Sequence, residues 1–269
     1  MTYFSSNYKR INYPIANDSA KGLRNAQIGA IHAIASHFTL FKDEAAIVIM
    51  PTGSGKTAVL ILSAYLLRAK RVLVISSSVM VRGQIVEEFS QLKTLKASSV
   101  FHSDLPLPKV KEIKSPIKSI EDWEALKEFD VVVGIPNSIN EGINDIFSPE
   151  VDLFDLILVD EAHHVPAFTW SNVVNRFTDA SKIFFTATPF RRDKKEIEGR
   201  VVYKYPLTKA YEDKIFGKIG YYPVITDNHD TDLAIALHKT AVEKGFWPED
   251  IDDIFIAKQC MMIVSEVTE

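Results

Sequence analysis

Five short runs of branched and aromatic apolar residues recur along the chain and are separated by longer segments with helical spacing. The runs occupy residues 45–50, 71–76, 129–134, 154–160 and 182–187. Because they are apolar at consecutive positions, they predict strands buried on both faces, as in a parallel sheet covered by helices. The segments 56–70 and 78–92 are long enough for the crossover helices that parallel strands require. The sequence therefore predicts an α/β fold in which a parallel β-sheet is sandwiched by helices.

Composition and charge limit the class of protein but not its partner. The 269 residues are 46% hydrophobic and 25% charged, the balance of a globular chain. A net charge of −4 gives no overall attraction to nucleic acid, so any such contact would need a local surface. The single cysteine, Cys260, excludes an internal disulfide and favours a cytoplasmic location. The apolar stretch 58–67 is too short to span a bilayer, so no membrane contact is expected.

The first predicted strand leads directly into PTGSGKT at 51–57 and then into an apolar helix, which is the context of a phosphate-binding loop. Gly53 and Gly55 allow backbone amides to point inward and, with the helix N-terminus, to form a cradle for anionic oxygens. Lys56 would add positive charge at the β and γ phosphates, and the Thr57 hydroxyl would help to hold Mg²⁺. Met50 stands where the general pattern has a glycine.

A second cluster of polar residues follows the fourth run, FDLILVDEAHH, where Asp160 and Glu161 are adjacent. In an open parallel sheet the ligand lies beyond the carboxyl ends of the strands, so both acids are predicted near the phosphate loop. Asp160 would hold the metal ion, and Glu161 would accept a proton from the attacking water as general base.

These motifs, with TATP at 186–189 and LRNAQ at 23–27, resemble motifs I, II, III and the adenine-reading Q motif of superfamily 2 DEAD/DEAH-box helicases. The amino-acid sequences of these motifs are most similar to those of the helicase subunits of type III restriction enzymes, and the resemblance covers roughly residues 20–195. It implies a P-loop NTPase with an N-terminal RecA-like lobe that binds ATP and Mg²⁺. The implied ATP-binding residues are Arg24, Gln27, Thr52, Gly53, Ser54, Gly55, Lys56 and Thr57.

The resemblance also implies roles outside phosphate binding. The catalytic residues would be Glu161, Lys56 and Asp160, with Thr57 and Asp160 at the metal. His163, Thr186 and Thr188 would couple hydrolysis to movement. For Gln27, an alternative interpretation is a polar residue on the exposed face of an amphipathic helix.

Nucleic acid would cross the top of the sheet after the second and third runs. SSSVMVRGQ at 76–84 resembles motif Ia, and VVVGIPNSI at 131–139 resembles motif Ib with Ile135 in place of threonine. Contacts of this kind position the nucleic-acid backbone and carry little sequence information. The candidate nucleic-acid-binding residues are Ser77, Ser78, Arg82, Gln84 and Asn137.

The remaining segments suggest the domain organisation. Residues 103–128 are expected to leave the sheet as a loop over its face, with one short helix. We expect a RecA-like lobe at 1–206, an interdomain connection at 207–254 and the opening strand of a second RecA-like lobe at 255–269. No arginine follows Arg200 to serve as the arginine finger of a second lobe, so the chain is expected to be one lobe of a longer motor and weakly active alone.

The expected function is therefore that of an ATP-dependent helicase or translocase acting on DNA, with RNA as an alternative, and partnered by its own second lobe. The amino-acid sequences of the motifs suggest a restriction or antiviral defence system with a partner subunit. Two other interpretations stay open: a P-loop ATPase or kinase that acts without nucleic acid, and an ATP-binding scaffold that does not hydrolyse.

Overall fold

The computed structural model describes residues 2–16, 21–140, 148–164, 172, 176–188, 197–215, 239, 242 and 243. The chain divides into two compact units, Met1–Phe216 and Gly217–Glu269. Only residues 239, 242 and 243 are described in the second unit, so most of the predicted connection beyond 215 and all of the predicted strand at 255–269 lie outside the described residues. The proposed domain boundaries therefore stay predictions.

The first unit contains a seven-stranded sheet whose neighbouring strands are all parallel, in the order β3-β4-β2-β5-β6-β1-β7. The parallel α/β fold is confirmed, and each of the five predicted strands is present. The strands are β1 (Ala46–Ile49), β2 (Val72–Ile75), β3 (Val110–Glu112), β4 (Val131–Gly134), β5 (Leu156–Val159), β6 (Ser181–Thr186) and β7 (Arg200–Lys204).

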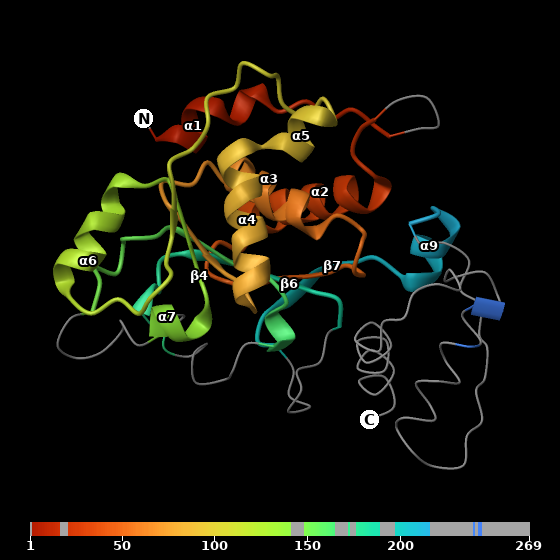
Figure 1. Cartoon of the computed structure of the whole chain (residues 1–269). Helices are drawn as coiled ribbons and strands as arrows, with labels where there is room; N and C mark the ends of the chain where they lie inside the picture. Colours follow the sequence, from red (N-terminus) through yellow and green to blue (C-terminus); the bar gives the residue numbers. More distant parts are fainter. Residues whose placement is uncertain are drawn as a thin grey trace, which may run out of the picture. The chain divides into compact units, whose positions relative to one another are not determined.

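Helices cover the two faces of this sheet, and Figure 1 shows α1 to α5 gathered together on one side of the strands. The long predicted helices after β1 and β2 are confirmed as α3 and α4. The described helices are α1 (Tyr3–Asn7), α2 (Asn25–Leu40), α3 (Lys56–Leu66), α4 (Val79–Gln91), α5 (Lys93–Ala97), α6 (Ile120–Ala125), α7 (Pro136–Asn140) and α9 (Leu207–Glu212), with 3-10 helices at Tyr8–Arg10, Leu126–Glu128 and Ala162–His164.

Two hydrophobic layers result, because consecutive strand residues point to opposite faces. On one face, Val48 and Val74 pack with apolar residues of α2, α3 and α4. On the other, Ile47 and Leu73 pack with Trp123 of α6 and neighbouring aromatic residues. The strands β1, β2, β4 and β5 have four residues each, and all of these residues are buried. Their burial explains why each strand is a continuous apolar run.

The expectation that residues 103–128 leave the sheet was wrong. Val110–Glu112 forms the edge strand β3, which pairs in parallel with β4, and only the short helix α6 agrees with the prediction. β3 has three residues and none of them is buried, so it lacks the apolar run that identified the other strands. Lys111 of this strand and the nearby Lys109, Lys114 and Lys118 are all exposed.

None of the helices in the described part of the chain has the length and apolar composition that crossing a lipid bilayer requires.

Candidate nucleotide-binding site

The glycine-containing loop follows β1 at the carboxyl edge of the sheet. Met50 is completely buried in the core beneath the loop, and its backbone N–H donates to the Thr186 carbonyl at 2.9 Å. The position therefore ends the strand and fills the core, which explains why a large apolar residue replaces the usual glycine there.

Two glycines give the loop its shape, because Gly53 and Gly55 have φ values of 79° and 91°. This left-handed region strains residues that carry a Cβ atom. Gly55 is also the N-cap of α3, so the backbone turns immediately before Lys56 and the helix N-terminus faces the loop. The Ser54 hydroxyl donates to the Pro51 carbonyl at 2.6 Å and closes the turn from inside.

The two loop glycines predict different responses to substitution. A Cβ atom at Gly55 would lie 2.2 Å from Gln27 Nε2, whereas a Cβ atom at Gly53 would meet nothing within 4 Å. Both Gly→Ala variants should lose about 1–2 kcal/mol of stability to backbone strain. We expect Gly55→Ala also to displace Gln27 and to weaken ATP binding more than Gly53→Ala. Urea unfolding and ATP titration of both variants test this, and equal ATP affinities in the two would contradict the role of the Gln27 contact.

The Q-motif residues hold the loop from the other side. Gln27 is in the first turn of α2, where its Oε1 accepts from the Arg24 backbone N–H at 2.8 Å and its Nε2 donates to the Gly55 carbonyl at 3.3 Å. Arg24 Nη1 donates to the Gly53 carbonyl at 2.5 Å. Gln27 is only 8% exposed, so the alternative of a solvent-facing residue is excluded.

The acidic pair reaches the loop across an intervening strand. β6 lies between β1 and β5, yet Lys56 Nζ and Glu161 Oε1 are 2.5 Å apart. The Glu161 side chain is 22% exposed, and its backbone has a φ value of 49°, which costs energy in a non-glycine residue. The structure thus brings motif I and motif II into direct contact.

Asp160 lies deeper than Glu161, at 8% exposure. Burial raises the pKa of its carboxyl group to about 6, and the neighbouring Glu161 charge adds to the rise, while Lys56 opposes it. The Oε2 atom of Glu161 is buried and makes no hydrogen bond among the described residues. A buried carboxyl group with a raised pKa therefore lies next in sequence to a carboxylate oxygen that has no hydrogen bond, an arrangement that a bound cation would stabilise.

The donor set fits a magnesium ion that is shared with a nucleotide. The structure places a threonine hydroxyl donor, Thr57, in the first turn of α3 beside Lys56, which contacts the acidic pair. In the described part of the chain there is no group of three or more His, Cys, Asp or Glu side chains that could hold a metal alone. Phosphate oxygens and water would have to complete the coordination, as is usual for magnesium.

Motif III joins this site through His163, whose Nδ1 lies 2.9 Å from Thr186 Oγ1. The Thr186 hydroxyl donates to the Thr188 carbonyl at 2.5 Å and accepts from the Thr188 N–H at 3.1 Å. With its single proton used, Thr186 Oγ1 must accept from His163, so the proton of the imidazole is on Nδ1. The structure therefore links all three residues that the resemblance assigns to coupling.

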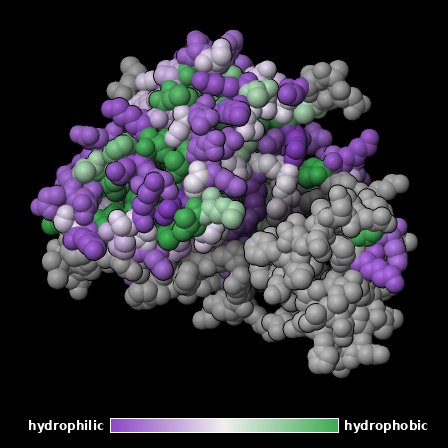
Figure 2. Space-filling view, in the orientation of Figure 1, coloured by the Kyte–Doolittle hydropathy of each residue, from purple (hydrophilic) through white to green (hydrophobic). Residues whose placement is uncertain are grey.

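The residues resembling motifs Ia and Ib follow the adjacent strands β2 and β4. Ser78 caps α4 by accepting from the Val81 N–H at 3.3 Å, and Gln84 and Asn137 are exposed. Figure 2 shows hydrophobic surface at the lower end of α4, where Val79 and Met80 are 59% and 76% exposed. Sequence reasoning did not select these two residues, because apolar side chains in a helix usually indicate a core.

Arg82 differs from the other candidates for nucleic-acid contact. It is 5% exposed, its Nε lies 2.9 Å from Glu112 Oε1, and its Nη1 donates to the Ile113 carbonyl at 3.0 Å. These contacts attach α4 to the edge strand β3 and leave the guanidinium turned away from solvent. Its charge is compensated within the protein, so Arg82 is not a candidate for contact with nucleic acid. Arg191 and Arg192 lie outside the described residues.

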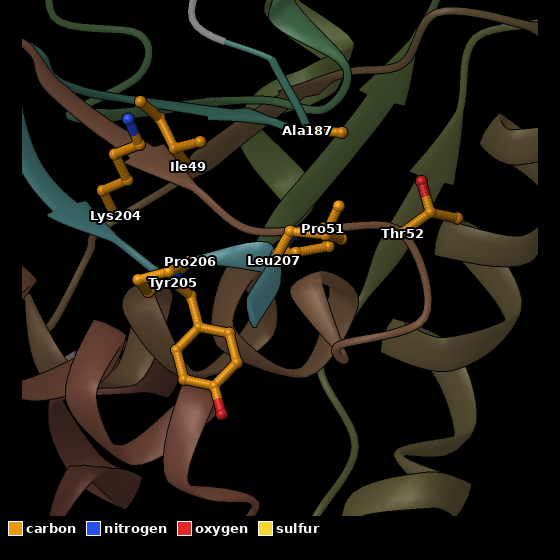
Figure 3. Close-up of a pocket in the computed structure, with 8 residues that line it drawn as sticks. All are labelled: Ile49, Pro51, Thr52, Ala187, Lys204, Tyr205, Pro206 and Leu207. Atoms are coloured by element: carbon orange, nitrogen blue, oxygen red, sulfur yellow. The ribbon is translucent and has the colours of Figure 1, made fainter. Parts of the chain in front are cut away.

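A pocket of about 410 Å³ borders the loop on the side of β7. Figure 3 shows that Pro51 of the loop and Leu207 of α9 approach each other across it, with Thr52 on one side and Lys204 on the other. The full lining consists of Ile49, Pro51, Thr52, Ala187, Lys204, Tyr205, Pro206 and Leu207.

Comparison with known sequences gives a family and a relative. The profile of the family described as "Type III restriction enzyme, res subunit" matches residues 20–191. Over 217 residues the chain is 26% identical to "Putative helicase 22" of Sulfolobus islandicus filamentous virus (isolate Iceland/Hveragerdi). That match covers 76% of this chain and 36% of the viral protein, so the chain spans about a third of its relative.

A solved structure shares the fold. The nuclease-deletion mutant of the Type ISP restriction-modification enzyme LlaGI, in complex with a DNA substrate mimic, aligns with a TM-score of 0.52 and 17% identity. The alignment covers 92% of this chain and 24% of that chain. The UvsW helicase from bacteriophage T4 aligns with a TM-score of 0.43 and 15% identity, over 69% of this chain and 59% of that one. The parallel sheet and its loop are those of a RecA-like P-loop NTPase lobe.

Proposed function

This chain belongs to the family of the type III restriction enzyme res subunit, and on that basis we propose that it is the ATP-binding lobe of a helicase or translocase that moves along DNA. The observation that carries the proposal is the 2.5 Å contact between Lys56 and Glu161. It joins the phosphate loop to the general base, so binding and hydrolysis of one nucleotide occur at one place.

In this proposal the residues of the loop bind and orient the triphosphate. Backbone amides of the loop and of the first turn of α3 would bind the phosphate oxygens, except that of Ser54, which donates to the Pro51 carbonyl at 3.2 Å. Arg24 and Gln27 lie at the end that would receive adenine. Thr57 and Asp160 would hold magnesium, which would supply positive charge to offset that of the phosphates.

Lys56 and Glu161 must change partners when the nucleotide binds. Lys56 exchanges the Glu161 carboxylate for phosphate oxygen, because the loop directs it to the phosphates. Glu161 is then free to accept the proton of the attacking water. While Lys56 is paired with Glu161, its positive charge offsets the charge of the general base.

Coupling to movement would pass through His163, Thr186 and Thr188. Their hydrogen bonds connect the end of β5 to the end of β6, next to Glu161, whose Oε2 lies 3.5 Å from His163 Nδ1. A change in the charge of Glu161 on hydrolysis would therefore alter the hydrogen bonds of His163 with motif III.

For nucleic acid we propose a surface made of Ser77, Ser78, Gln84 and Asn137, with Val79 and Met80 beside them. The residues follow adjacent strands at the carboxyl edge, and Ser76 N–H donates to the Gly134 carbonyl at 2.9 Å, which keeps the two ends together. Hydroxyl and amide groups suit contacts to the phosphate backbone. DNA is favoured over RNA because the family is one of restriction enzymes.

The complete motor would need a second RecA-like lobe, since an arginine from that lobe meets the charge that develops on the transferred phosphoryl group. We place the lobes at 1–206 and from 255 onward, joined by 207–254, within a longer cytoplasmic protein. A restriction or antiviral defence system with a partner subunit is the setting that the family suggests.

The test is titration of the 269-residue chain with ATP and Mg²⁺, followed by steady-state ATP hydrolysis with and without single-stranded DNA. We expect ATP to bind and turnover to stay low, with DNA changing the ATP affinity. Absence of ATP binding would overturn the proposal. ATP binding that neither DNA nor RNA affects would support a kinase or a scaffold, and rapid turnover would show that a second lobe is not required.

A further inference from the structure

The segment after β7 is tied to the nucleotide site through Asp213, the residue that follows α9. Its Oδ2 accepts from the Tyr205 hydroxyl and, at 3.3 Å, from Asn25 Nδ2. Its Oδ1 lies 3.2 Å from Lys209 Nζ. Both carboxylate oxygens are therefore used, and one of them joins residues that are 188 positions apart.

Asn25 is the first residue of α2 and stands between the two residues of the Q motif that touch the phosphate loop. Arg24 before it contacts the Gly53 carbonyl, and Gln27 after it contacts the Gly55 carbonyl. A displacement of Asn25 would move this first turn, because helical backbone hydrogen bonds link its residues. Asp213 thus acts on the loop through the residues that would receive the base of ATP.

The other partner of Asp213 is rigid. Tyr205 is 6% exposed, its N–H donates to the Ile49 carbonyl at 2.9 Å, and its ring stacks with that of Tyr203 at 6.3 Å between centroids. Tyr203 in turn packs against Gly29 of α2, where an added Cβ atom would lie 2.5 Å from its hydroxyl. Asp213 is therefore held beside β7 by Tyr205, and it offers Asn25 an acceptor at a defined position.

We propose that Asp213 is a positioning residue for nucleotide recognition: by anchoring Asn25 it sets the first turn of α2 so that Arg24 and Gln27 meet the base of ATP. The proposal rests on the proposed ATP-binding function. It predicts that Asp213 contributes to the affinity for the base and not to the affinity for the phosphates, which the loop amides and Lys56 bind by themselves.

The test compares ATP with inorganic triphosphate, which lacks the base, by calorimetric titration of the full chain in Mg²⁺. In Asp213→Ala we expect the Kd for ATP to rise about three- to tenfold, because a change of this size corresponds to the free energy of one or two hydrogen bonds. The Kd for triphosphate should stay within about twofold. Asp213→Asn keeps an acceptor oxygen and should recover most of the ATP affinity.

The matched control is Glu212→Gln, which alters the adjacent acid. Glu212 also pairs with Lys209, at 3.2 Å, and is exposed, and among the described residues it makes no hydrogen bond to Tyr205 or Asn25. It should bind both ligands like the unaltered chain. Equal weakening of ATP and triphosphate in Asp213→Ala, or no change in either, would overturn the positioning role. If the unaltered chain binds neither ligand, the proposed function itself fails.

Discussion

Replacing Lys56 by alanine is expected to raise the Kd for ATP about a hundredfold or more, because the variant loses a charge that the loop directs at the phosphates. Removing one partner of a close, partly buried charge pair typically costs about 2–5 kcal/mol. The Lys56 side chain is 9% exposed and its partner Glu161 is 22% exposed, so both are largely removed from water. Calorimetric titration with ATP and Mg²⁺ measures the effect.

Glu161→Gln is the matched control, since it also breaks the 2.5 Å ion pair. Both variants should therefore lose similar stability in urea, but only Lys56→Ala should lose ATP affinity. Glu161→Gln removes repulsion between a carboxylate and the triphosphate, so it should bind ATP at least as tightly as the unaltered chain and show no hydrolysis. Strong ATP binding by Lys56→Ala would contradict the assignment of the phosphate loop.

Asp160→Asn is expected to stabilise the chain without nucleotide by up to about 3 kcal/mol above pH 6. The pKa of Asp160 is raised from 3.8 to about 6 by burial and by the Glu161 charge. Between these two pH values the folded protein holds a proton that the unfolded chain has released, so stability falls as pH rises from about 4 to about 6. A shift of this size corresponds to about 3 kcal/mol. Asparagine, which does not ionise, avoids this loss.

The measurement is urea unfolding of both proteins at several pH values. Their stabilities should agree near pH 4, and the difference should grow until about pH 6 and then stay constant. With Mg²⁺ and ATP the difference should shrink, because the magnesium nucleotide stabilises the unaltered chain, which retains the carboxylate, more than it stabilises Asp160→Asn. A difference that does not vary with pH would show that Asp160 ionises normally in the folded protein.

The interior strands and the phosphate loop were predictable because their signals are local. A strand buried on both faces must be apolar at every position, and a loop that wraps phosphate needs glycines at left-handed φ, as observed at Gly53 and Gly55. The edge strands lack such a signal. β3 is half-exposed and includes Lys111, and β7 is mostly exposed and begins and ends with a charged residue, so neither has the unbroken apolar run of an interior strand.

By itself, then, the sequence determined the fold class and predicted which residues form the candidate phosphate loop and its acidic neighbours, since both follow from short contiguous patterns. Only the tertiary structure decided the partners of the charged residues. Arg82 pairs with Glu112, Lys56 pairs with Glu161, and Asp213 accepts hydrogen bonds from Tyr205 and Asn25. These partners come from separate elements that are brought together by the order of the strands. The sequence does not distinguish a charged residue that faces water from one that contacts a buried partner. The difference lies in the residues around it in space and not in its neighbours along the chain.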